Sequence, residues 1–156
     1  MKWLLAIVGG LVALGAIGAT VTPKSSIDYA EATDEERTVW LKERGDEIGR
    51  GVSDGLKASG MNHAQMALSS KEYDPDRKEI TFAIEVKGSV RMGYPNNFSI
   101  QFQDQMCPIF RRSGLAKEGI RTTFKIVRSN GDVVRSDTIS ASVCDRLDAF
   151  KARRLS

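Results

Sequence analysis

Residues 119–144 read "GIRTTFKIVRSNGDVVRSDTISASVC", and this stretch carries the clearest structural signal in the chain. Asn130 and Gly131 are the pair that a two-residue type I′ turn favours, because both positions of that turn need a positive φ. The stretch therefore predicts a β-hairpin. We expect its second strand to be long and to end at Cys144.

Pairing outward from the turn joins four pairs of residues: Ile120 with Ala141, Thr122 with Ile139, Phe124 with Asp137, and Ile126 with Arg135. The two pairs far from the turn suit one buried face of a sheet. The two pairs near the turn set an apolar side chain against a charged one. This mismatch predicts a bulge, or a hairpin end that reaches past the core.

Two helices and one strand are expected before the hairpin. Residues 33–60 predict a helix, because Thr33 and Glu36 match a capping box and an apolar stripe follows. Residues 93–114 predict a second helix, capped by Asn96 or Asn97. The apolar stripes of the two helices are Leu41, Ile48, Val52 and Leu56 in the first, and Phe98, Phe102, Met106, Ile109 and Phe110 in the second.

Asp74-Pro75-Asp76 predicts a turn, and the strand after it alternates apolar with polar or small residues from Ile80 to Val86. Gly114 or Gly119 is expected to end the second helix or the turn behind it.

The order helix, strand, helix, hairpin predicts an exported α+β domain over residues 34–148. A polar tether at residues 23–33 precedes it, and a basic, frayed tail at residues 149–156 follows it. We expect a three-stranded sheet packed by two helices, with the second hairpin strand in the middle. This order, 1-3-2, makes the connection through the second helix a right-handed crossover between parallel strands.

The first 22 residues differ from the rest of the chain, because residues 3–21, "WLLAIVGGLVALGAIGATV", carry no charge. As a helix this run would be about 28 Å long, close to the hydrocarbon thickness of a bilayer. It predicts a transmembrane anchor through the bilayer. A cleaved signal peptide is the alternative, since Ala16 and Gly18 suit the small positions of a cleavage site.

Both interpretations export the domain. Lys2 and the N-terminal amine precede the apolar run while acidic residues follow it, so the N-terminus is expected to stay in the cytoplasm. The anchor places the protein in the inner (cytoplasmic) membrane with its domain on the periplasmic side, and cleavage would make it a secreted or periplasmic protein. The net charge of +3 does not favour nucleic acid as a partner.

No catalytic, metal or cofactor site is predicted. His63 is the only histidine, and no nucleophile motif surrounds it. Carboxylate pairs such as Asp74 with Asp76, or Glu43 with Glu47, suit acid–base work, but a turn and a solvated helix face explain them equally. Two cysteines 37 residues apart with one histidine match no zinc spacing.

A basic stretch is the candidate binding patch: Arg111, Arg112, Lys117, Arg121, Lys125 and Arg128. Such a patch suits anionic lipid headgroups or an acidic partner, and a solvated strand face is the alternative. The apolar stripe of the second helix would suit a ligand groove as well as a core.

Cys107 and Cys144 are predicted to form a disulfide, because export places both thiols in an oxidising compartment. Cys107 has no histidine beside it and lies away from a helix start, so nothing indicates a reactive thiol. Strand alternation would point Cys144 away from the buried face, which argues against the bond. Closing this loop would stabilise the fold by about 3–4 kcal/mol.

These features together predict a membrane-tethered, non-enzymatic envelope protein that binds another envelope or membrane protein as an accessory subunit of a membrane complex. The alternative is a secreted inhibitor or ligand-binding module released after signal cleavage. Whether a small molecule binds is not decided by the sequence.

Overall fold

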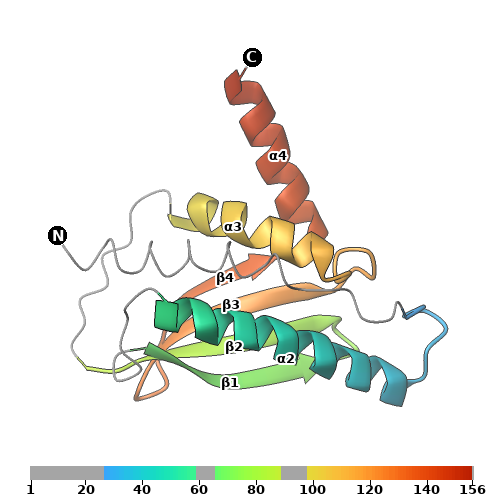
Figure 1. Ribbon diagram of the computed structural model, residues 1–156, viewed down its shortest axis with the longest axis horizontal. Coiled ribbons are helices and arrows are strands. Elements are labelled where there is room, and N and C mark those ends of the chain that lie inside the picture. Colours follow the sequence, from blue (N-terminus) through green and yellow to red (C-terminus); the bar gives the residue numbers. More distant parts are fainter. Residues whose placement is uncertain (1–26, 59–65, 89–97, 156) are drawn as a thin grey trace.

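The structure is a computed structural model that describes residues 27–58, 66–88 and 98–155 (Figure 1). The apolar run at residues 3–21, His63 and the expected helix caps at Asn96 and Asn97 lie outside these residues. Within the described ranges no helix is long and apolar enough to cross a membrane. The elements are α2 (Asp34–Ala58), β1 (Met66–Asp74), β2 (Glu79–Val86), α3 (Phe98–Arg112), β3 (Arg121–Arg128), β4 (Val133–Ile139) and α4 (Ala141–Leu155).

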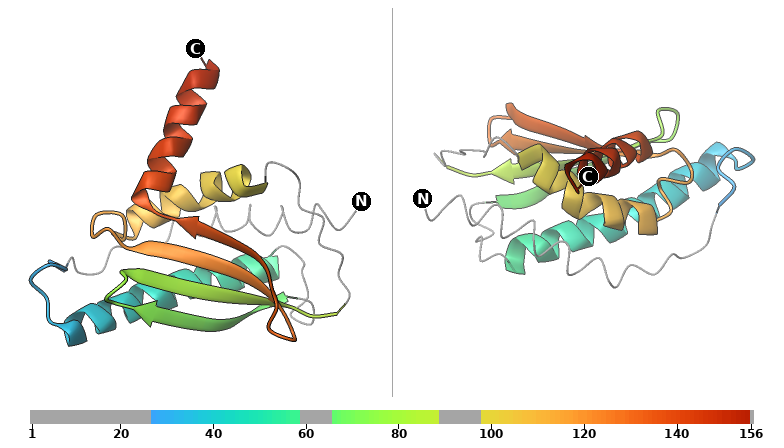
Figure 2. Two further views of the ribbon diagram at one scale, coloured as in Figure 1. Left: turned by 180° about the vertical axis from the view of Figure 1, so that it is seen from behind. Right: turned by 90° about the horizontal axis from the view of Figure 1, so that it is seen from above.

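The domain is a mixed α+β fold built on a four-stranded sheet of order β1-β2-β3-β4. The β2 and β3 strands run parallel, and the two outer pairs are antiparallel. Figures 1 and 2 show α2 over β1 and β2, and α3 on the same face over β3 and β4. The opposite face of the sheet carries no helix from the described part of the chain (Figure 2).

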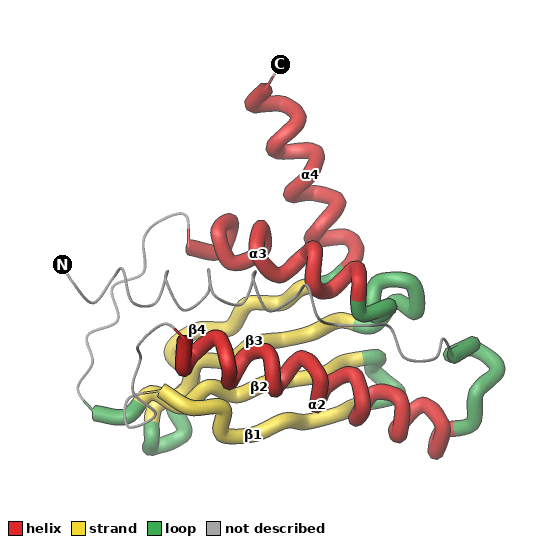
Figure 3. The backbone as a smooth tube through the Cα atoms, in the orientation of Figure 1, coloured by secondary structure: helices red, strands yellow, loops and turns green. Residues whose placement is uncertain are grey.

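The predicted strand order is wrong, because β2 and β3 pair directly. Phe82 lies opposite Phe124, and Ile84 lies opposite Ile126. The crossover through α3 therefore joins two adjacent parallel strands and needs no strand between them (Figure 3). Strand β4 lies at the edge because it carries Arg135 and Asp137 on its helix-facing side, where a central strand would bury them.

Strand β1 was not expected from the sequence, so the sheet has four strands where three were predicted. Its pairing shifts at Ser69, which is an extra residue between Leu68 opposite Ile84 and Ser70 opposite Ala83. This bulge breaks the alternation that reveals a strand in a sequence. Both edge strands carry such a bulge, and a bulge hinders edge-to-edge pairing of sheets.

The hairpin register is confirmed. Thr122 pairs with Ile139, and the two mismatched pairs nearer the tip also form as predicted. The predicted bulge is present as well, since Val134 is an extra residue in β4. Arg135 and Asp137, the charged residues that lie opposite apolar ones, bond to each other and to the Ser99 hydroxyl of α3. Their charged groups therefore have polar partners beside the core.

The prediction of a type I′ turn is wrong. Gly131 has the positive φ that this turn needs, 88°, but Asn130 does not, because Lys78 is the one non-glycine residue of the described chain with a positive φ. The strands are instead joined by the four residues 129–132, closed by a bond from Arg128 N to Asp132 O at 2.9 Å. The Val134 bulge compensates for the longer loop and preserves the register beyond it.

The hairpin's second strand is shorter than predicted, and the tail is a helix. Strand β4 ends at Ile139, so the expected pair of Ile120 with Ala141 does not form. Ser140 caps the helix that follows, because its Oγ accepts a bond from Val143 N at 3.3 Å. Residues 149–155, expected as a frayed tail, belong to α4.

The predicted start of the first helix and the predicted core agree with the structure. Thr33 and Glu36 form the capping box, with Thr33 N donating to Glu36 Oε2 at 2.8 Å and Glu36 N to Thr33 Oγ1 at 3.3 Å. The core is one cluster in which Phe82 stacks on Phe124 with ring centroids 5.2 Å apart. Tyr29, from the expected tether, is 2% exposed and packs into this core.

Close contact between α2 and β1 depends on a glycine. A Cβ at Gly45 would lie 2.3 Å from Cε1 of Tyr73. The Tyr73 ring is held in place, because its hydroxyl donates to Asp46 Oδ1 at 3.1 Å and Lys71 also donates to Asp46. Burial and then the Asp46 carboxylate raise the pKa of Tyr73 to about 12, so this phenol stays protonated at physiological pH.

Gly45→Leu should therefore destabilise the domain by about 1–3 kcal/mol, because the new side chain must displace the Tyr73 ring. Urea unfolding measures the loss. Arg50→Leu, at an exposed position of the same helix, is the control and should change the free energy of unfolding by less than about 0.5 kcal/mol. Equal stability of Gly45→Leu and the control would contradict the close packing.

Candidate protein-interaction surface

Helix α4 projects from the domain (Figures 1 and 2). Its base is buried, with Cys144 at 0% and Leu147 at 5% exposure. Beyond Leu147, every residue whose burial is described, through Arg154, is exposed. The helix therefore has an anchored base and a distal half, residues 149–155, that stands away from the sheet.

The predicted disulfide is confirmed and anchors this helix. The Sγ atoms of Cys107 on α3 and Cys144 on α4 are 2.06 Å apart. The objection from strand alternation disappears, because Cys144 lies in the first turn of a helix and not at the end of a strand. Both cysteines are buried, so the bond is shielded from solvent.

Charged side chains add to the contact between the two helices. Arg111 donates to Asp145 at 3.1 Å and to Asp148 at 2.8 Å, and one turn further out Lys151 bonds to Asp104. The bond to Asp148, followed by the bond to Asp145, raises the pKa of Arg111. Because these pairs are exposed, each stabilises the contact by about 0–1 kcal/mol. They therefore set the direction of α4 but contribute little to its stability.

The distal half of α4 exposes an aromatic ring among basic groups. Phe150 is 39% exposed, and the Arg154 guanidinium lies over its ring at 4.7 Å from the centroid. Residues 149–156 contain three basic residues and no acidic one. This combination of an exposed ring and an adjoining arginine is typical of sites that bind proteins.

The structure does not gather the predicted basic patch into one cluster. Arg111 is bound to two aspartates of α4, and Arg121 pairs with Glu79 at 2.9 Å. Arg121 and Arg128 lie at opposite ends of β3, about 23 Å apart at the rise of a strand. Lys125 lies between them on the open face of the sheet, and Arg112 and Lys117 are exposed near the end of α3.

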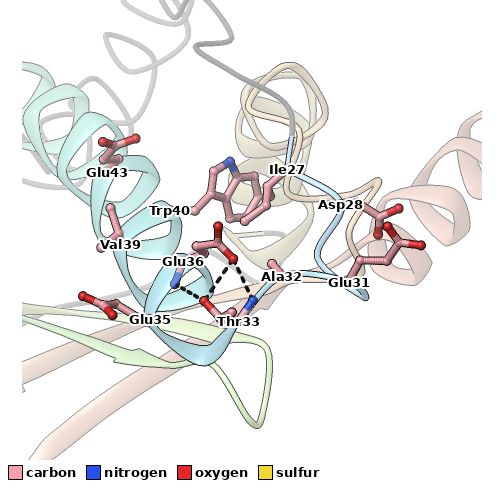
Figure 4. Close-up of a pocket in the computed structure, with 10 residues that line it drawn as sticks. All are labelled: Ile27, Asp28, Glu31, Ala32, Thr33, Glu35, Glu36, Val39, Trp40 and Glu43. Atoms are coloured by element: carbon pink, nitrogen blue, oxygen red, sulfur yellow. Dashed lines mark hydrogen bonds between the residues drawn. The ribbon is translucent and has the colours of Figure 1, made fainter.

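A hollow of about 880 Å³ lies at the start of α2, and we call it the acidic hollow (Figure 4). Its lining consists of Ile27, Asp28, Glu31, Ala32, Thr33, Glu35, Glu36, Val39, Trp40 and Glu43. None of these ten described residues is basic. Hydrogen bonds from Thr33 lower the pKa of Glu36, which keeps its carboxylate charged. Val39, which is 52% exposed, gives the hollow an apolar patch.

One member of each carboxylate pair noted in the sequence has a structural partner. Asp74 accepts a bond from Arg77 N at 2.8 Å within the β1–β2 turn. Glu47 pairs with Arg44 at 3.2 Å, while Glu43 lines the acidic hollow. Within the described ranges, no three His, Cys, Asp or Glu side chains are grouped so as to hold a metal ion.

Sequence reasoning missed α4, the element that carries this surface. A usable signal was present, because Ser140 precedes Val143, Leu147 and Phe150 at helical spacing. The β-hairpin pattern immediately before it led the expected strand through these residues to Cys144. The apolar stripe of α3 proved to be core, with Phe102, Met106, Ile109 and Phe110 buried.

No protein-family model matches the chain, and no curated protein matches its sequence. Among solved structures, the chain is similar to the pilotin EpsS of the Vibrio vulnificus type 2 secretion system. The TM-score is 0.45 at 12% sequence identity, over 71% of this chain and 97% of that chain. A likeness this weak carries no argument about fold or function.

Replacing both cysteines, Cys107→Ala with Cys144→Ala, should lower the free energy of unfolding by about 3–4 kcal/mol, because the unfolded chain loses its closed loop. Urea unfolding under oxidising conditions measures this loss. Arg146→Ala, at an exposed position of α4, is the control and should unfold like the unaltered protein. A double variant within about 1 kcal/mol of the unaltered protein would contradict a structural role for the bond.

Proposed function

We propose that this protein is a membrane-tethered, non-enzymatic envelope protein that binds another protein through the distal half of α4, as an accessory subunit of a membrane complex. The observation that carries the proposal is a helix that is fixed at its base by a buried disulfide and exposes Phe150 and Arg154 beyond it.

The disulfide supports an exported location. Structural disulfides persist in oxidising compartments and are rare in the cytosol. The uncharged run at residues 3–21 supports export independently, because it has the length and composition of a membrane anchor. The proposed place of the domain is therefore the periplasmic side of the inner membrane, with the N-terminus in the cytoplasm.

The fixed helix supports protein binding. A binding element that is already ordered pays less conformational entropy on association than one that must fold. Aromatic and arginine side chains supply much of the binding energy at protein interfaces, and the distal half of α4 presents one beside the other. The predicted basic patch is not proposed as a second surface for anionic lipid or an acidic partner, because its six residues do not form one cluster and Arg111 and Arg121 are paired with carboxylates.

Co-purification tests the proposed function. Full-length tagged protein, expressed at native level and extracted in nonionic detergent, should retain a partner at a fixed ratio. Phe150→Ser should reduce that partner at least tenfold, because an exposed aromatic anchor is lost. Arg146→Ser, on the anchored part of α4, is the control and should retain it.

Two results would contradict the proposal: a single species from gentle extraction, or a partner that Phe150→Ser leaves in place. The mass of the purified chain decides between the two locations. A chain that begins at Met1 supports the anchor, and one that begins near Ala19 supports the secreted alternative.

A further inference from the structure

We propose that the distal half of α4 of one copy of this chain docks into the acidic hollow of a second copy, so that the protein self-associates. The inference rests on the proposed function, since it takes the distal half of α4 as the docking surface, and it names the partner of that surface.

The two surfaces are complementary in charge. The distal half of α4 carries Arg153 and Arg154, together with Lys151, which also bonds to Asp104 of α3, and it has no acidic residue. The acidic hollow carries five carboxylates without a basic residue among its ten lining residues. The hydrogen bonds from Thr33 lower the pKa of Glu36 and so favour its charged form.

The two surfaces also match in apolar character. Phe150 is 39% exposed on the helix, and Val39 is 52% exposed in the hollow, next to the buried ring of Trp40. A hollow of about 880 Å³ has room for an aromatic side chain and its flanking charges. Figure 4 shows the carboxylates of Glu35, Glu36 and Glu43 around this apolar patch.

The contact must form between two chains. Helix α4 extends outward beyond β4 at one edge of the sheet, whereas α2 lies over β1 and β2 at the opposite edge (Figures 1 and 2). The distal half of α4 therefore points away from the hollow of its own chain. Two chains would form a closed symmetric dimer if each placed the distal half of its α4 in the acidic hollow of the other, which makes two such contacts.

The contact should be weak and sensitive to salt. Half a helix buries less surface than a standard interface, and its charges are exposed and therefore screened. Tethering to one membrane raises the effective concentration of the second copy, which compensates for a low affinity.

Charge reversal on full-length protein in nonionic detergent tests the inference by sedimentation velocity. Arg153→Glu with Arg154→Glu, and separately Glu35→Lys with Glu43→Lys, should each weaken self-association at least tenfold. Mixing the two variants should restore association, because one retains a native hollow and the other a native α4. Association through residues 3–21 involves no charge and should not respond to either change.

Two single reversals serve as controls: Arg146→Glu on the anchored part of α4 and Glu72→Lys on the exposed edge strand β1 should both associate like the unaltered protein. Circular dichroism of each variant checks that it folds. The inference is overturned if the unaltered protein shows no salt-sensitive association at concentrations near 100 µM. It is also overturned if the reversed variants associate normally, or if mixing them restores nothing.

The same variants separate this inference from the proposed function. If the α4 reversal removes a different envelope protein in co-purification and the unaltered chain does not self-associate, the inference fails and the proposed function stands. Binding of the unaltered chain to vesicles of anionic phospholipid, lost in the α4 reversal while self-association is absent, also overturns the inference. If α4 binds nothing in either experiment, both fail.

Discussion

The bond between Cys107 and Cys144 joins a helix that covers the sheet to a helix that extends away from it. Helix α3 is held by its own buried stripe, but α4 buries little beyond Cys144 and Leu147. An isolated helix of this length is marginal in water. The bond therefore supplies the stabilisation of α4 that its small buried surface does not provide. The exposed pairs of Arg111 with Asp145 and Asp148 set the direction of the helix.

The position of α4 gives the domain two chemically different ends. The basic distal half of α4 lies beyond β4, and the acidic hollow lies at the start of α2. On the open face of the sheet, Thr123 donates to Glu79 at 2.6 Å and bonds to Thr138 at 2.9 Å. Each end combines an exposed apolar side chain, Phe150 or Val39, with charges of one sign, and this combination makes the two ends the candidate contact surfaces.

Most local features were readable from the sequence, and features that depend on distant residues were not. The Thr33–Glu36 box, the alternation through Phe82 and the hairpin register from Thr122 to Ile126 formed as predicted, whereas the two-residue turn at Asn130-Gly131 did not. The strand order failed because it depends on how the whole sheet excludes the charges of β4 from its centre. Strand β1 and helix α4 were missed because a bulge and a neighbouring strand pattern obscured their periods. The disulfide was predictable from export alone. How Cys144 reaches Cys107 was not, because it depends on Cys144 lying in the first turn of α4.

We expect the Cys107–Cys144 bond to hold α4 in place on a sheet that stays folded when the bond is reduced. Hydrogen–deuterium exchange of the full chain before and after reduction tests this. Amides of residues 145–154 should exchange rapidly once the bond is reduced, while amides of β2 and β3 should stay protected, with protection lowered by no more than about 3–4 kcal/mol, which the bond contributes to global stability. Unchanged protection of α4 after reduction, or complete loss of protection in α4 and the two strands together, would contradict this role of the bond.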